Sequence, residues 1–189
     1  YHARIALKEF SMKVGINGMG RIGRLALRSA LGGIRRPDSD PRAGNRLEVA
    51  HINELKGGIA ATAHLLEFDS IHGRWHESIG IDSDNAVAIG KDRIGFSELA
   101  CPGDVAWGDL GCDVVLECTG FFASKEKASA HLSAGARKVL ISAPAGGVDV
   151  VGAESTIARA RELRSPVRII HPSDRRGILD GGVAPPRNT

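Results

Sequence analysis

The chain has 189 residues, which is enough to bury one hydrophobic core and carry a tail. Its net charge of +3 comes from basic residues that are scattered along the sequence, which does not favour a nucleic acid as partner. The cysteines Cys101, Cys112 and Cys118 have neither metal-site nor disulfide spacing, so we expect a reduced, cytoplasmic protein. Residues 1–11 precede a natural start at Met12 and are too short and polar for a signal peptide or a membrane span, so we interpret them as an upstream extension.

The most informative stretch begins with an apolar strand predicted at residues 13–16 and continues into three glycines spaced as G-x-G-x-x-G. Gly18 permits a tight turn, Gly20 lets the backbone approach a pyrophosphate, and Gly23 lets the following helix pack on the sheet. The helix that begins near Arg21 would present free amide groups and a positive dipole end to phosphates. A surface turn is the alternative. However, the strand and an apolar helical stripe flank the glycines in the order that a dinucleotide-binding turn requires.

The same pattern predicts an acidic residue at the end of the second strand, where a carboxylate binds the adenosine ribose. Residues 47–53 predict this strand, and Glu54 is the acid, with a solvated strand end as the alternative. The acid comes late in the chain because residues 34–46, which contain proline and glycine, are expected to form an inserted loop. A carboxylate at this place repels a 2′-phosphate and favours NAD over NADP, and Lys56 would weaken that preference.

Two further apolar runs, residues 113–118 and 137–142, predict buried strands of a parallel sheet. Between them, residues 125–134 predict a helix, with Ser124 as N-cap and Gly135 as its end. The alternation of strand, helix and strand predicts an α/β protein with a Rossmann-type doubly wound, mostly parallel sheet.

Ligands of open α/β sheets bind at the carboxyl ends of the strands. Residues from four predicted strand ends should therefore surround one crevice: Gly18, Glu54, Thr119 and Ser142.

The histidines do not form a metal motif. His64, His72 and His76 lie near one another without an H-E-x-x-H pattern or a cysteine partner, so we expect solvated or core histidines and no metal. His131 is expected on the surface of its helix. Cys118 ends a buried strand and is expected to be an inert core thiol.

Four segments form a specific set: residues 15–24 (GINGMGRIGR), 63–75 (AHLLEFDSIHGRW), 115–122 (VLECTGFF) and 141–144 (ISAP). In this order they resemble the NAD-binding half of phosphorylating glyceraldehyde-3-phosphate dehydrogenases. The resemblance covers roughly residues 12–145 and is closest to the branch associated with arsenate resistance. It implies that the insertion at residues 69–75 is structural.

The resemblance implies NAD as the cofactor and assigns individual positions to its binding. One group forms the pyrophosphate turn and includes the acid that binds the ribose. A second group lies on the nicotinamide side. In chain order these positions are Asn17, Gly18, Gly20, Arg21, Ile22, Gly23, Glu54, Thr119, Gly120 and Ser142. The chain departs from the family at residues 100–102, Ala-Cys-Pro, where many members have an Arg-Asp-Pro sequence.

In the family, a cysteine attacks a phosphorylated aldehyde, a histidine takes up the proton, and the product is an acyl phosphate with hydride transferred to NAD. No cysteine follows Cys118 in this chain, and the strand predicted at residues 167–170 ends in His171. Residues 146–189 contain neither lysine nor aromatic residues. We interpret them as an atypical tail that replaces the start of the catalytic domain, from a shifted reading frame or an incomplete gene, with a diverged tail as the alternative.

Three functions remain open. The chain is the NAD-binding half of a glyceraldehyde-3-phosphate dehydrogenase that is not catalytic alone, a non-catalytic dinucleotide-binding module, or a non-functional gene remnant. The expected partner is NAD, with a small phosphorylated aldehyde only in the intact family. No membrane partner is expected, and the family forms homo-oligomers.

Overall fold

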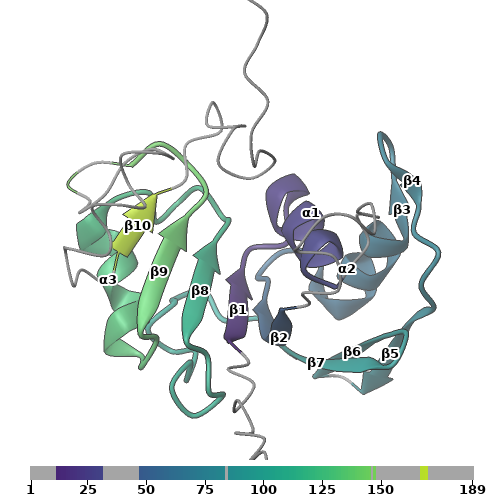
Figure 1. Cartoon of the computed structure of the whole chain (residues 1–189), viewed down its shortest axis with the longest axis horizontal. Helices are drawn as coiled ribbons and strands as arrows, with labels where there is room; N and C mark the ends of the chain where they lie inside the picture. The colour runs from purple at the N-terminus through teal and green to yellow at the C-terminus, as the bar shows by residue number, and fades with distance from the viewer. Residues whose placement is uncertain (1–11, 32–46, 84, 146, 148–166, 170–189) are drawn as a thin grey trace, which may run out of the picture.

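The computed structural model of the chain describes residues 12–31, 47–83, 85–145, 147 and 167–169. The upstream extension, the loop predicted at residues 34–46 and most of the tail therefore lie outside the described residues. In chain order, the elements are β1 (Lys13–Asn17), α1 (Arg21–Ala30), β2 (Glu48–Asn53), α2 (Gly58–Glu67), β3 (Phe68–Asp69), β4 (Gly73–Arg74), β5 (Ile79–Ser83), β6 (Ala86–Ile89), β7 (Asp92–Ser97), β8 (Val114–Glu117), α3 (Lys125–Ser133), β9 (Lys138–Ile141) and β10 (Val167–Ile169) (Figure 1).

A single eight-stranded sheet organises the described chain, in the order β10-β9-β8-β1-β2-β7-β6-β5. The strands from β10 to β7 are parallel, and β6 and β5 add an antiparallel meander at one edge. From β1 the chain moves through β2 to β5 at the far edge, comes back through β6 to β7 beside β2, and then crosses to β8 on the other side of β1. This reversal of direction is the topological switch point of a doubly wound sheet, so the predicted Rossmann-type fold is confirmed.

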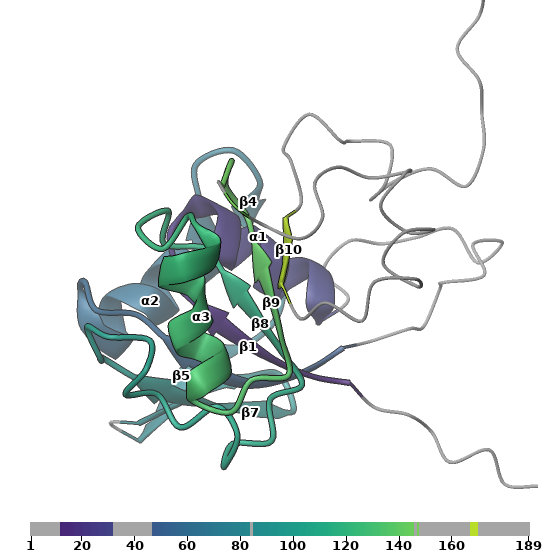
Figure 2. The same ribbon diagram turned by 90° about the vertical axis from the view of Figure 1, so that its left-hand side faces the viewer.

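The parallel strands bury apolar side chains because helices and loops cover both faces of the sheet. Val14 and Ile16 of β1 pack in one core cluster with Leu27 of α1 and Leu66 of α2. Val115 of β8 packs in a second cluster around Trp107, and Ala128 of α3 packs on Val139 and Ile141 of β9 in a third cluster. Figure 1 shows α1 and α2 beside the right-hand part of the sheet, and Figure 2 shows α3 alongside β8 and β9.

The helix boundaries that the sequence predicts agree with the structure. The hydroxyl of Ser124 accepts a hydrogen bond from the Lys127 amide at 3.2 Å and caps α3. Gly135 follows the end of that helix with a φ of 95°, in the left-handed region that glycine favours. β10 also falls inside the strand predicted at residues 167–170 and pairs in parallel with β9.

Helix α2 and strands β3 to β7 were not predicted as elements. α2 begins at Gly58 after the N-cap residue Gly57; both glycines have positive φ, and the helix has no side-chain N-cap that the sequence could reveal. After α2, the short antiparallel pair β3–β4 lies at the insertion for which the sequence implied only a structural role, and Trp75 beyond it is buried. β7 takes the parallel position next to β2 and so contributes to the edge that carries the site.

Within the described residues, no helix is both long enough and apolar enough to cross a membrane.

Candidate functional site

The glycine turn after β1 has the geometry that its sequence predicts. Gly18 has a φ of 96°, and a Cβ at this position would lie 2.7 Å from the Thr119 amide nitrogen. A Cβ on Gly23 would lie 2.0 Å from the Gly18 carbonyl oxygen, so only glycine lets α1 approach the turn this closely. Gly20 differs from both, because no atom lies within 4 Å of the position that its Cβ would take. Space for a ligand therefore lies directly over Gly20.

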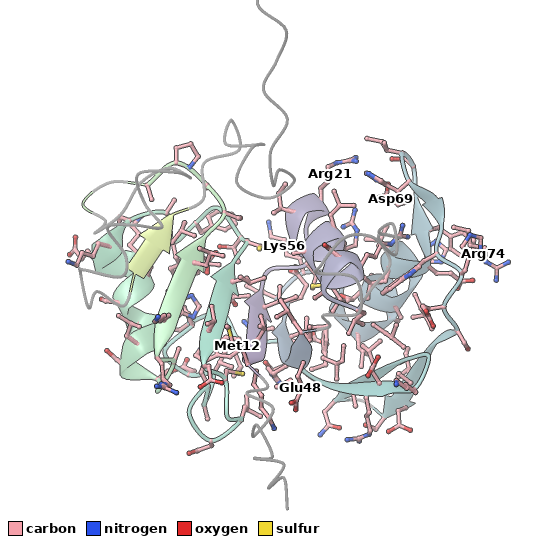
Figure 3. All side chains as sticks on the ribbon, viewed as in Figure 1. Met12, Arg21, Glu48, Lys56, Asp69 and Arg74 are labelled. Atoms are coloured by element: carbon pink, nitrogen blue, oxygen red, sulfur yellow. The ribbon has the colours of Figure 1, made fainter. Side chains whose placement is uncertain are left out.

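The N-terminus of α1 points into this space. Gly20 is the N-cap residue, and the first turn contains no acidic side chain that would neutralise the helix dipole. Arg21 and Ile22 begin the helix and are both exposed. Figure 3 shows Arg21 and Lys56 at the same upper edge of the molecule, whereas Met12 and Glu48 lie at the opposite edge. An anion at this upper edge would meet unpaired backbone amides and the positive end of the dipole.

Glu54 follows β2, and its carboxylate reaches the glycine turn. Its Oε2 accepts a hydrogen bond from the Met19 amide at 2.5 Å, and its Oε1 accepts one from the Lys56 amide at 2.8 Å. The acid predicted to bind the ribose is thus held beside the turn by two backbone donors. Lys56 Nζ lies 5.8 Å from the centre of the Phe121 ring, so cation and ring face each other from loops after β2 and β8.

A cavity of about 480 Å³ lies at this edge. Five of the residues predicted to bind the cofactor line it, namely Asn17, Gly18, Gly20, Glu54 and Thr119. The rest of the lining comes from residues that the sequence does not predict to bind the cofactor: Asn53, Leu55, Lys56, Leu99, Ala100, Cys118, Phe121 and Phe122. For Lys56, the sequence predicts only an effect of its charge on the choice between NAD and NADP. A volume of this size, with glycines and polar groups at one side, is typical of a small-molecule site.

The other predicted site residues lie near the cavity but are not part of its lining: Arg21, Ile22, Gly23, Gly120 and Ser142. Gly23 supports the turn from behind. The Ser142 amide donates to the Glu117 carbonyl at 2.9 Å, which places Ser142 at the end of β9 beside β8. The predicted crevice is therefore supported for Gly18, Glu54 and Thr119, with Ser142 one strand further out.

Beneath the cavity, Glu117 is buried at the end of β8 with a relative exposure of 1%. Its Oε2 accepts hydrogen bonds from Asn17 Nδ2 at 2.6 Å and from His131 Nε2 at 2.9 Å. Its Oε1 accepts one from the Thr119 amide at 2.7 Å and another from the Thr119 hydroxyl. Burial alone would raise the pKa of Glu117, but hydrogen bonds from His131, Thr119 and Asn17 outweigh it and lower the pKa below its usual range.

The prediction for His131 was wrong. Its ring is fully buried rather than on the surface of α3, and it packs 5.7 Å from Trp107 and 6.3 Å from Phe122, between ring centres. The reason is the hydrogen bond to Glu117, which satisfies the imidazole Nε2 inside the protein. The available signal was the spacing of Ala128 and His131, which share one face of the helix at i and i+3.

Two of the three described cysteines, Cys112 and Cys118, are not activated. Burial raises the pKa of Cys112 and of Cys118 to about 11. Cys118 is half-buried and is in this sense the inert thiol that the sequence predicts. Among the described residues, no three histidine, cysteine or acidic side chains gather where they could hold a metal ion.

Comparison with known proteins agrees with this geometry. The family model for the glyceraldehyde 3-phosphate dehydrogenase NAD binding domain matches residues 12–125. Similar curated proteins include the plasmid-encoded glyceraldehyde-3-phosphate dehydrogenase of Cupriavidus necator, at 49% identity over 74% of this chain and 38% of that protein. The enzyme of Clostridium acetobutylicum is 51% identical over 71% of this chain and 36% of its own length. That of Pseudomonas aeruginosa is 42% identical over 79% and 43%.

The chain thus spans about two fifths of the length of these relatives. The matched region contains the glycine turn, Glu54 and the end of β8, which are parts that surround the cavity. The cofactor of this domain is NAD. The chain belongs to the glyceraldehyde-3-phosphate dehydrogenase family, and residues 12–125 form its NAD-binding domain.

Proposed function

We propose that the cavity at the carboxyl edge of the sheet is the NAD site, and that the chain binds this cofactor without turning over an aldehyde alone. The single observation that carries this proposal is the open space over Gly20 beside the free N-terminus of α1. The turn residues Asn17 and Gly18 and the helix-start residues Arg21 and Ile22 would hold the pyrophosphate. These residues lie where the first turn of α1 presents unpaired backbone amides to an anion.

The remaining contacts follow from the placement of the other residues. Glu54 would accept hydrogen bonds from the adenosine ribose, because its carboxylate lies 2.5 Å from the Met19 amide and therefore directly beside the turn. Thr119, Gly120 and Ser142, which follow β8 and β9, would lie on the nicotinamide side. When bound, NAD supplies a hydride acceptor. The protein residues bind and orient it.

The reaction of the complete enzyme requires a thiolate that attacks the aldehyde carbon. Cys112 and Cys118 are poor nucleophiles, because burial raises the pKa of each to about 11. Cys101 is exposed but lies in the loop after β7 without a histidine partner among the described residues. We therefore propose that oxidation of a phosphorylated aldehyde needs residues that the described part of this chain does not supply. A non-catalytic NAD-binding module is the second candidate, and it shares the same site.

From the family we also propose a homo-oligomeric, cytoplasmic protein. We further propose that the NAD-binding domain extends from residue 12 to residue 145 and that residues 146–189 are an atypical tail in place of the start of the catalytic domain, with β10 of this tail added to the sheet beside β9.

The decisive experiment titrates NAD into the full chain by calorimetry, beside the variant Gly20→Val. We expect saturable binding to the wild type and none to the variant, because the valine side chain fills the space over the turn. The fold should survive, since no atom lies within 4 Å of the new Cβ. The weaker N-cap costs about 1 kcal/mol. Gly80→Val on β5 is the matched control, because it also adds a side chain in open space, far from the cavity.

Two further titrations identify the ligand. NADP should bind more weakly than NAD to the wild type, since the Glu54 carboxylate repels a 2′-phosphate. Glu54→Ala should weaken NAD binding and narrow the difference between the two dinucleotides. A folded wild-type chain that binds neither dinucleotide would overturn the proposal. Equal binding by wild type and Gly20→Val would move the site elsewhere.

A further inference from the structure

The polar side chains beneath the cavity form one continuous hydrogen-bonded chain across four neighbouring strands. Asn17 Nδ2 donates to Glu117, and Asn17 Oδ1 accepts from Asn53 Nδ2 at 2.8 Å. The Asn53 Oδ1 accepts from the Ser97 hydroxyl at 2.8 Å, and Ser97 Oγ lies 2.8 Å from His51 Nε2. The chain therefore runs from β8 through β1 and β2 to β7. We refer to these five residues as the buried polar chain.

Two members of the buried polar chain hold residues that line the cavity. Glu117, at one end, accepts hydrogen bonds from both the amide and the hydroxyl of Thr119. Asn53, in the middle, donates through Nδ2 to the Leu99 carbonyl at 2.9 Å and accepts through Oδ1 from the Leu99 amide at 2.9 Å. Thr119 and Leu99 both line the cavity, whereas Glu117 lies behind it.

Each side-chain amide can take only one orientation. Asn17 must direct its NH₂ group to Glu117, because a carboxylate only accepts. Its oxygen therefore faces Asn53, which must direct its own NH₂ group back. That orientation leaves the Asn53 oxygen as the acceptor for Leu99 and Ser97. Reversing the Asn17 amide would set its oxygen against the Glu117 carboxylate, and reversing Asn53 with it would set donor against donor and acceptor against acceptor at Leu99, whereas the Ser97 hydroxyl could rotate to accept.

We propose that Glu117 is a positioning residue for the NAD site. The buried polar chain fixes the two walls of the cavity relative to each other, so that a change at one wall is transmitted to the other. This inference rests on the proposed function only in naming the ligand. His131 of α3 donates one hydrogen bond to Glu117 and so links this helix to the buried polar chain. The titratable groups that face the Glu117 carboxylate are His131 and Cys118.

The ionised carboxylate is required for chemical reasons. Glu117 receives donors on both oxygens, two on each. A glutamine has the same shape, but it replaces one accepting oxygen with a donating NH₂ group. It must therefore oppose either the Thr119 amide or the Asn17 amide. If the glutamine NH₂ group opposes the Thr119 amide, the hydrogen bond that holds the Thr119 wall of the cavity is lost. If it opposes the Asn17 amide, the side-chain amides of the buried polar chain must reverse as far as the contact with Leu99.

The test compares wild type with Glu117→Gln by NMR of the backbone amides in the full chain. An amide proton bound to a carboxylate resonates far downfield, so the Thr119 signal reports directly on Glu117. We expect the Thr119 and the Leu99 amide signals to move together in Glu117→Gln, although Leu99 does not contact Glu117. We also expect the Kd for NAD to rise about tenfold, because the cavity walls lose their fixed positions.

His131→Leu and His131→Gln serve as a matched pair at a residue outside the cavity lining. The leucine removes one donor from Glu117, and we expect smaller shifts at the same two amides. The glutamine retains a donor and should restore the wild-type signals. This pair also keeps the test decisive if Glu117→Gln does not fold. Val139→Ala controls for lost stability, since Val139 is buried under α3 without touching the buried polar chain.

The proposal is overturned if the Leu99 amide stays at its wild-type position in every variant that moves Thr119. It is equally overturned if Glu117→Gln weakens NAD binding no more than Val139→Ala does. A wild type that does not bind NAD would contradict the proposed function, but the coupling of the two amides would still be measured without ligand.

Discussion

At the scale of single residues, the glycine turn shows why the G-x-G-x-x-G spacing predicts the local backbone structure. The positive φ of Gly18 and the close contact of Gly23 with the Gly18 carbonyl are local features of the turn, and such features follow from local sequence. His131 shows the opposite case. Its partner Glu117 is 14 residues away on a neighbouring strand, and nothing local indicates that a helix histidine turns inward to meet it.

A second buried histidine gives a prediction at the same scale. Burial lowers the pKa of His51 to about 4, so the folded protein keeps the ring neutral while the unfolded chain titrates near 6.5. The unfolded chain therefore binds more protons between these values, and stability falls as pH falls through that range. We expect Tm to fall between pH 7 and pH 5 in the wild type and to fall less in His51→Gln.

The exposed His76 provides the control, because His76→Gln should leave the pH dependence of the wild type unchanged. Glu117 cannot explain the same effect, since its lowered pKa moves its contribution below the ordinary carboxyl range. Parallel melting curves for wild type and His51→Gln across this range would contradict the prediction.

At the scale of elements, the strands and helices that the sequence predicts are those with a strong local signal. β1, β2, β8 and β9 are apolar runs, and α3 carries a side-chain cap. α2 and the meander β5–β7 were missed. α2 begins with Gly58 directly after Gly57, and all five residues of β5 are half-exposed or exposed, polar and apolar without clear alternation. β5 and β6 are stabilised by pairing within the sheet next to β7 and by packing on α2. Both interactions join residues from different elements of the chain.

One arginine joins three of these elements. Arg28 of α1 is buried and donates to the Leu66 carbonyl at 2.5 Å and to the Gly73 carbonyl at 3.3 Å. Its guanidinium also lies 5.5 Å from the centre of the Trp75 ring. A cation therefore satisfies the last carbonyls of α2 and holds the β3–β4 ribbon against α1.

We expect Arg28→Met to destabilise the fold by about 2 kcal/mol, because buried carbonyl groups lose their donors. Arg28→Lys should recover only part of this loss, since an ammonium group cannot reproduce the planar fork. Urea unfolding followed by circular dichroism measures both. Arg137→Met is the control. It removes an exposed ion pair with Asp113, which is expected to contribute less than about 1 kcal/mol to the free energy of unfolding. Similar midpoints for Arg28→Met and Arg137→Met would refute this role.

At the scale of the whole molecule, the order of the strands determines where the ligand binds. The chain reverses direction between β1 and β8, and the loops after these strands diverge there, which leaves the cavity open at their carboxyl ends. The sequence predicts this edge from the strand and helix alternation alone. It could not predict Leu55, Leu99 and Phe121 as lining residues, because no short motif links a loop side chain to a distant strand end.

Binding at this edge should stabilise the molecule as a whole. A ligand that binds only the folded state adds about 2.7 kcal/mol at a free concentration of one hundred times its Kd. We expect Tm in scanning calorimetry to rise with the logarithm of NAD concentration in the wild type. Gly20→Val should show no such rise, while Gly80→Val should follow the wild type. A rise in Gly20→Val would mean that NAD stabilises the fold from another place.

The two backbone amides that hold Glu54 also have a kinetic consequence. The carboxylate reaches its position beside the turn when the protein folds, before any ligand arrives. Encounter with NAD then requires little rearrangement of this side chain, so association should proceed in a single step at an ordinary bimolecular rate. Substitutions around the cavity would alter chiefly the dissociation rate of the dinucleotide. The NAD-binding domain would therefore control mainly the residence time of NAD.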